Sequence, residues 1–212
     1  MSELLTSVEF NNTVTSVEAM RAVANEGAIA IHNFIPAQHL QRAVRVLSLA
    51  DWENDNNPHN EKVDRDHDLV KYGFAADQYW PVASGAMGYA PEPVYHIARK
   101  ISDFVSAAPE ANWNANEIMG IRYQPEGFIE KHRDYAWALG YVAVLTVSGS
   151  QGFYFERDNG DETRVDMSPG TLTIMRGYQA GAEKPRPYHW VEPATEERLA
   201  VSLREVAKPW DS

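Results

Sequence analysis

Two histidines and one aspartate are the residues of this chain with the clearest potential for chemistry. His132 and Asp134 lie two positions apart in the segment GFIEKHRDYAW, and residues two apart in an extended segment point to the same side. An imidazole and a carboxylate at this spacing can bind one metal ion together. His189, separated from Asp134 by 54 residues, supplies a third ligand. Two histidines and one carboxylate on one face of an octahedron leave three positions open, an arrangement typical of non-haem Fe(II) sites.

The other histidines have weaker contexts for metal binding. His59 and Glu61 offer suitable ligand types but lie in an Asn-rich segment without a strand, where we expect a solvated turn. His67, inside DRDHD, is predicted to lie in a charged surface loop. Ordinary packing or surface positions are expected for the remaining histidines, His32, His39 and His96. The sequence therefore favours a single metal site.

A strand near the C-terminus adds an anion-binding residue. In RLAVSLR, alternation places Arg198, Ala200, Ser202 and Arg204 on one face and the leucines and the valine on the other. An arginine directed into a protein interior is costly unless it meets an anion, and its guanidinium suits a carboxylate. The simpler alternative for Arg198 is a surface salt bridge with Glu196 or Glu197.

The elements that must position these residues change in type along the chain. Thr15 and Glu18 form a capping-box pattern that opens a helix, which Gly27 would close. We expect a strand over 28–34, a helix beginning at Pro36 and another helix over 93–106. The segment 51–91 has no steady period, and its length indicates either a functional loop or short hidden elements.

From Glu117 onward the sequence is rich in short strands that turn signals separate. These strands are EIMGIRY, YVAVLTVSG, GFYFE, TRVDM, TLTIMR, YHWV and RLAVSLREV. We therefore predict a mainly β protein whose core is a jelly roll, with flanking helices packed outside. We expect one domain over 1–212, with a helical and mixed N-terminal part over 1–116 and the core over 117–206.

Composition excludes several function classes. The chain of 212 residues has no cysteine, which removes disulfides, thiolate metal sites and cysteine nucleophiles. Its net charge of −11 argues against a large polyanionic partner such as nucleic acid and favours a small molecule. We expect no secretory signal and no membrane span, hence a cytoplasmic location. Oligomeric state cannot be inferred from these features.

The pattern His132-x-Asp134, then His189, then Arg198 resembles the Fe(II)/2-oxoglutarate-dependent dioxygenase superfamily. The resemblance covers about residues 117–206 and implies a double-stranded β-helix. Within the superfamily, the Arg198-x5-Arg204 spacing and Tyr123 look most like the AlkB-type branch. That branch carries asparagines where this chain has two apolar residues, Ile121 and Ala200.

The resemblance also implies roles and cofactors. Fe(II), 2-oxoglutarate and O2 would be the cofactors, with Arg198 binding the distal carboxylate of 2-oxoglutarate, Tyr123 beside it and Arg204 nearer the metal. Asp134, which related halogenases replace with a small residue, indicates hydroxylation, demethylation or desaturation of a C–H bond, with release of succinate and CO2. From their positions in the sequence, we expect the substrate contacts to include Tyr135, Trp137 and Arg176. The alternatives are that the two aromatic residues belong to the core and that Arg176 keeps its loop soluble.

Two alternatives remain open at this point. The first is an AlkB-like enzyme that modifies nucleic acid or protein. The second is a non-enzymatic, cupin-like binding module in which the histidines hold a structural metal or none.

Overall fold

The computed structural model describes residues 8–54, 64–73, 90–134, 138–178 and 184–206. Its helices are α1 (Ser16–Glu26), η1 (Ala37–His39, a 3-10 turn), α2 (Gln41–Leu47) and α3 (Glu92–Ser106). The N-terminal strands are β1 (Glu9–Asn11), β2 (Ala28–His32), β3 (Glu53–Asn54) and β4 (Asp64–Gly73). The remaining strands are β5 (Glu117–His132), β6 (Ala138–Ser148), β7 (Gln151–Glu156), β8 (Glu162–Met167), β9 (Leu172–Arg176), β10 (His189–Val191) and β11 (Arg198–Val206).

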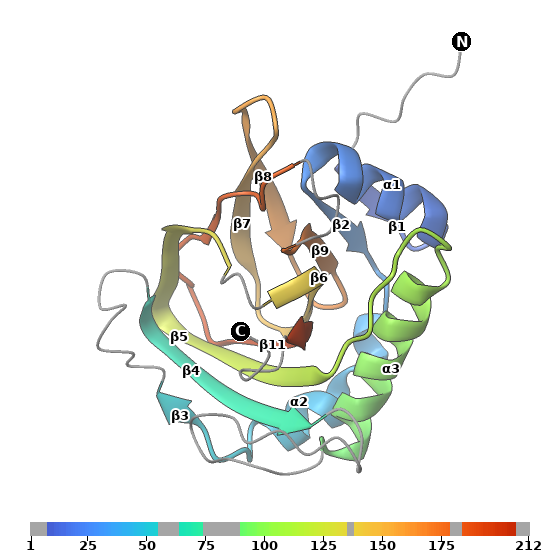
Figure 1. Ribbon diagram of the computed structural model, residues 1–212. Coiled ribbons are helices and arrows are strands. Elements are labelled where there is room, and N and C mark those ends of the chain that lie inside the picture. The colour runs from blue at the N-terminus through green and yellow to red at the C-terminus, as the bar shows by residue number, and fades with distance from the viewer. Residues whose placement is uncertain (1–7, 55–63, 74–89, 135–137, 179–183, 207–212) are drawn as a thin grey trace.

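The strands form two facing layers joined by β5 (Figure 1). The hydrogen-bonded order is β1-β2-β9-β6-β11-β5-β10-β7-β8, with β4 on the other side of β5. Residues 117–123 of β5 pair with β11, whereas residues 129–132 pair with β10. β5 thus contributes to a larger sheet (β1, β2, β9, β6, β11, β5, β4, β3) and to a smaller one (β5, β10, β7, β8). The predicted double-stranded β-helix is confirmed.

A local distortion lets β5 cross from one sheet to the other. Glu126 has φ +68°, in the left-handed region that residues other than glycine rarely adopt. Its backbone N–H donates to Ala194 O at 2.8 Å, and Ala194 N–H donates to Gly127 O at 3.0 Å. These bonds hold the bend, which separates Tyr123 in the larger sheet from His132 in the smaller one.

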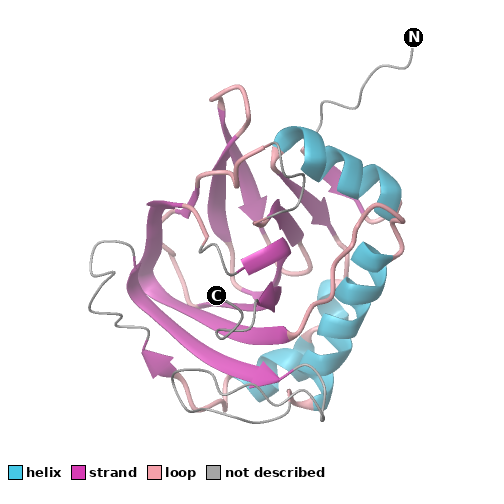
Figure 2. Ribbon diagram, in the orientation of Figure 1, coloured by secondary structure: helices cyan, strands magenta, loops and turns pink. Residues whose placement is uncertain are grey.

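The helices cover the outer face of the larger sheet (Figure 2). Apolar side chains of α1, α2 and α3, such as Met20, Leu47 and Ile101, pack with the outward residues of β6 and β11, such as Leu145 and Leu203. The interior between the sheets contains separate apolar clusters, and its larger-sheet wall includes Leu69, Met119, Ile121, Tyr123 and Ala200. No helix of the described residues is long and apolar enough to cross a membrane.

Most of the elements predicted for the N-terminal half are confirmed. Thr15 and Glu18 form the capping box of α1, and Gly27 ends this helix with φ +93°. The helix expected from Pro36 is instead the 3-10 turn η1 followed by the short α2.

The irregular segment 51–91 contains a long strand that the sequence did not reveal. This strand, β4, lies beside β5, as Figure 1 shows. The interpretation of His67 as a surface residue is wrong, because His67 lies on β4 and only 7% of its surface is exposed. His59 and Glu61 lie outside the described residues.

Candidate active site

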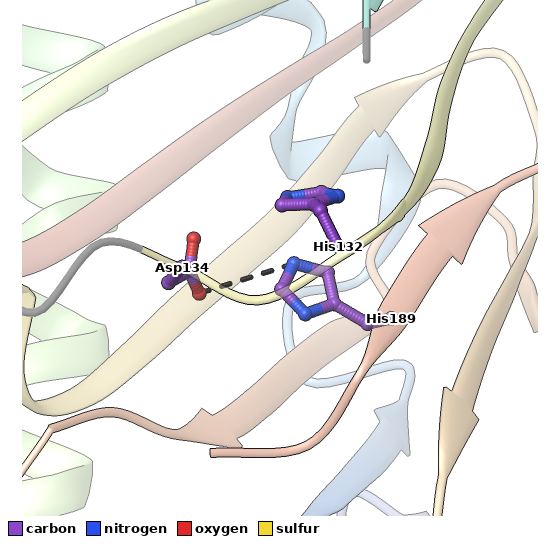
Figure 3. Close-up of side chains that lie close together, drawn as sticks. All are labelled: His132, Asp134 and His189. Atoms are coloured by element: carbon purple, nitrogen blue, oxygen red, sulfur yellow. Dashed lines mark ion pairs between the residues drawn. The ribbon is translucent and has the colours of Figure 1, made fainter. Parts of the chain in front are cut away.

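The three predicted metal ligands lie close together (Figure 3). His132 ends β5, Asp134 follows two residues later, and His189 begins β10 directly opposite His132 in the strand pairing. One ligand atom from each residue lies within 4.8 Å of the other two. The distance from His189 Nε2 to Asp134 Oδ2 is 3.9 Å, and the imidazole centroids are 4.3 Å apart. Antiparallel pairing of β5 with β10 therefore assembles the triad.

Backbone carbonyls orient both imidazoles. His132 Nδ1 lies 2.7 Å from Glu130 O, and His189 Nδ1 lies 3.4 Å from Pro187 O. A carbonyl oxygen can only accept, so each Nδ1 carries the proton and each Nε2 is left as the ligand atom. A metal ion that binds at Nε2 needs this tautomer, in which Nε2 carries no proton.

The donor set fits Fe(II). Within the described ranges, no other three or more histidine, aspartate or glutamate residues cluster as closely as these. His189 is buried, and His132 and Asp134 are partly buried, so the group is accessible from one side. Two imidazoles and one carboxylate from a single side leave coordination positions for other ligands.

Arg198 is a buried cation without a carboxylate partner among the described residues. It is 1% exposed, and its guanidinium donates to Thr146 Oγ1 at 3.0 and 3.3 Å and to Gln151 Oε1 at 3.4 Å. Burial lowers the pKa of Arg198 below its ordinary value, and a hydrogen bond with Tyr123 opposes this shift. Neutral oxygens do not compensate a full buried charge, so this site is suited to an anion.

The neighbours of Arg198 are themselves fixed in place. Gln151 donates from Nε2 to Gly127 O at 2.9 Å and also to Glu192 O, which turns its Oε1 toward the guanidinium. The Tyr123 ring lies 5.2 Å from Arg198 Cζ. The predicted alternation of β11 is confirmed, because Leu199, Val201 and Leu203 all belong to the cluster beneath the helices.

Arg204 has a different environment from Arg198. Its guanidinium pairs with Glu117 at 2.7 and 2.9 Å and approaches Met119 Sδ at 2.7 Å. Both partners of this ion pair are nearly buried, with side chains 12% and 11% exposed. The charge of Arg204 is therefore compensated by the protein, and Arg198 is the better receptor for an added carboxylate.

Arg176, expected among the substrate contacts, is buried and is bound by other groups of the protein. Its side chain is 1% exposed, pairs with Asp158, and donates to Ala24 O at 2.9 Å and Pro185 O at 2.8 Å. These contacts fasten the end of α1 and the segment before His189 to β9. Tyr135 and Trp137, the other expected substrate contacts, lie outside the described residues.

His67 is the residue near the site that the sequence interpretation missed. Its imidazole stacks on Tyr123, with centroids 4.8 Å apart and an interplanar angle of 27°. The pKa of His67 is lowered to about 4, mainly by burial; Asp68 opposes this shift, and the charges of Arg198, His132 and Arg204 add to it. The spacing of His67 and Leu69 gave a weak strand signal, which the neighbouring charged residues obscured.

No family model matches the sequence. No curated protein matches it either. Solved structures do share the fold at low identity, with matches to a Trichoplax adhaerens prolyl hydroxylase in complex with a hypoxia inducible factor peptide fragment, to OsALKBH1, and to a 2OG-Fe(II) oxygenase family protein from Burkholderia pseudomallei.

The extent of these matches is similar. The prolyl hydroxylase is 14% identical with a TM-score of 0.69, over 90% of this chain and 88% of its own. OsALKBH1 is 14% identical with a TM-score of 0.60, and the match covers 84% of this chain and 97% of OsALKBH1. The Burkholderia protein is 13% identical with a TM-score of 0.63, and the match covers 94% of this chain and 97% of the Burkholderia protein. The fold expected from the resemblance is thus shared with all three proteins, without preference for the AlkB-type one.

Proposed function

We propose that this chain is an Fe(II)- and 2-oxoglutarate-dependent oxygenase that oxidises a C–H bond of a small molecule and releases succinate and CO2. The observation that carries the proposal is the pairing of two sites in one interior. One is a His132–Asp134–His189 triad that leaves metal positions open, and the other is a buried Arg198 suited to a carboxylate. Tyr123, which pairs with Arg198, lies on the same strand as His132, which supports occupancy of the two sites by one elongated dicarboxylate.

Each residue has a role that follows from its contacts. The triad would hold Fe(II), which supplies the chemistry of O2 when bound. Arg198 binds the distal carboxylate of 2-oxoglutarate, while Tyr123, Thr146 and Gln151 hold the guanidinium in position. Hydroxylation, demethylation and desaturation all remain compatible with the retained Asp134.

The pairing of charges on the outer face of the smaller sheet supports a small substrate over a nucleic acid. On the outer face of the smaller sheet, Lys131 pairs with Glu156 at 2.7 Å and Glu162 at 2.9 Å. On the same face, Arg164 pairs with Glu192 at 2.8 Å and with Asp166 at 2.6 Å. Cations that carboxylates already neutralise offer little attraction to a phosphate backbone.

The proposal is tested by anaerobic titration of the apo protein with Fe(II) and then 2-oxoglutarate. A keto acid chelated to Fe(II) is expected to give a visible charge-transfer band in the wild type. His132→Ala is expected to abolish the band. His39→Ala, which removes an exposed histidine of η1, is the matched control and is expected to retain it. A wild type without the band, or a band of full strength in His132→Ala, contradicts the proposal.

A second candidate is hydroxylation of a protein side chain. The likeness to a prolyl hydroxylase bound to a peptide fragment favours it, at 14% identity and a TM-score of 0.69. Succinate release, measured over matched panels of free small molecules, proline-containing peptides and single-stranded oligonucleotides, separates the candidates. Stimulation by peptides alone would replace the small-molecule assignment.

A further inference from the structure

We infer that His67 is a positioning residue for the cosubstrate, which holds the Tyr123 ring against Arg198. This inference rests on the proposed function, because it assigns the Arg198 end of the interior to 2-oxoglutarate. His67 comes from β4, a strand outside the segment that carries the metal ligands and the arginine.

The strand pairing places His67 at the end of a polar row. His67 pairs with Tyr123 across β4 and β5, and Tyr123 pairs with Arg198 across β5 and β11. Arg198 then reaches Thr146 of β6 through its guanidinium. The residues two positions further along the three strands, on the same face and toward Leu69, are apolar, namely Leu69, Ile121 and Ala200.

The contacts define what His67 does in this row. Its ring stacks on Tyr123 at 4.8 Å, and Tyr123 in turn hydrogen-bonds Arg198 and lies against it. The imidazole thus limits the positions that the tyrosine ring can take. Because burial keeps the pKa of His67 at about 4, the imidazole is neutral at neutral pH. It therefore restrains the tyrosine without adding a second positive charge beside Arg198.

A mere packing role would be satisfied by any side chain of similar volume, which gives the test. His67→Leu keeps most of the volume but removes the flat ring, whereas His67→Phe keeps a ring that can stack. Leu69→Ala is the matched packing control, because Leu69 lies two residues along β4 on the same interior face.

The measurement is the Kd of 2-oxoglutarate from the Fe(II) titration, together with KM for 2-oxoglutarate and kcat at saturation. We expect His67→Leu to raise Kd and KM by about threefold to tenfold, as the loss of one aromatic stack would, with kcat nearly unchanged. His67→Phe is expected to remain within about twofold of the wild type, since the stack survives. Leu69→Ala is expected to lower thermal stability without changing Kd.

Three outcomes would overturn the inference: an unchanged Kd in His67→Leu, an equal rise in Leu69→Ala, or a defect in His67→Phe as large as in His67→Leu. A wild type that binds no 2-oxoglutarate would instead contradict the proposed function itself. The two failures are therefore distinguishable.

Discussion

Replacement of Arg198 by methionine tests the anion site most directly, because the affinity for 2-oxoglutarate should fall while the stability of the ligand-free protein should not. In the proposed complex, a guanidinium fork donates two charge-assisted hydrogen bonds to a carboxylate. Each such bond contributes about 1.5–3 kcal/mol. Their loss predicts a Kd for 2-oxoglutarate about 10²- to 10⁴-fold higher in Arg198→Met.

The stability of the ligand-free protein should not fall in the same variant. Arg198 is 1% exposed and, among the residues that the structure describes, contacts only neutral groups, so the folded protein carries the desolvation cost of its charge. Methionine removes that cost and fits beside Met167, which already contacts the guanidinium. We expect the free energy of unfolding of ligand-free Arg198→Met to equal or exceed that of the wild type.

The assays are the Fe(II) titration for affinity and chemical denaturation with and without 2-oxoglutarate. At 100 times the wild-type Kd, the ligand should add about 2.7 kcal/mol to the stability of the wild type and at most about 0.4 kcal/mol to that of Arg198→Met at the same concentration.

Arg204→Met is the control for the stability argument, because it leaves the carboxylate of Glu117 nearly buried without its cation. It should cost about 3 kcal/mol of stability. If Arg198→Met bound 2-oxoglutarate within tenfold of the wild type, or lost as much stability as Arg204→Met, the reasoning would be refuted.

Three further predictions follow from the described contacts. His189→Ala and Asp134→Ala should each abolish the charge-transfer band, because each removes one of the three ligands; equilibrium dialysis with Fe(II) checks whether metal is still retained. The pKa of His67 is about 4 in the folded protein, against an ordinary value of 6.5. Between these two pH values His67 gains a proton only in the unfolded state. The free energy of unfolding should therefore fall by up to about 3 kcal/mol as the pH drops from 6.5 to 4. Denaturation across this range should show a shallower dependence on pH in His67→Leu, and parallel curves would contradict the assigned burial. Asp158→Ala should cost about 3 kcal/mol, since it leaves the buried Arg176 without its carboxylate, and an unchanged denaturation midpoint would argue against this ion pair.

The features that could be predicted from the sequence are those that short-range patterns encode. His132 and Asp134 share a face because residues two apart in an extended segment point the same way. Alternation along β11 directs Arg198 inward, and the capping box marks the start of α1. Each of these rules depends only on residues close together in the chain, so reading the sequence was sufficient.

Which groups meet across the fold was decided by tertiary structure. Arg198 and Arg204 have the same side-chain chemistry and lie on the same face of one strand. The pairing of β11 with β5 nevertheless places Arg204 opposite a carboxylate, Glu117, and Arg198 opposite a tyrosine, Tyr123. Arg176 received a carboxylate from the β7–β8 turn in a similar way.

The same reason explains why His67 was misread as a surface residue. Its burial depends on the register of β4 against β5, two strands joined through a long connection that contains α3. Local sequence carries the direction in which a side chain points, whereas the partner it meets depends on strand register over long separations. That partner sets the charge compensation of a buried group, and through it the group's function.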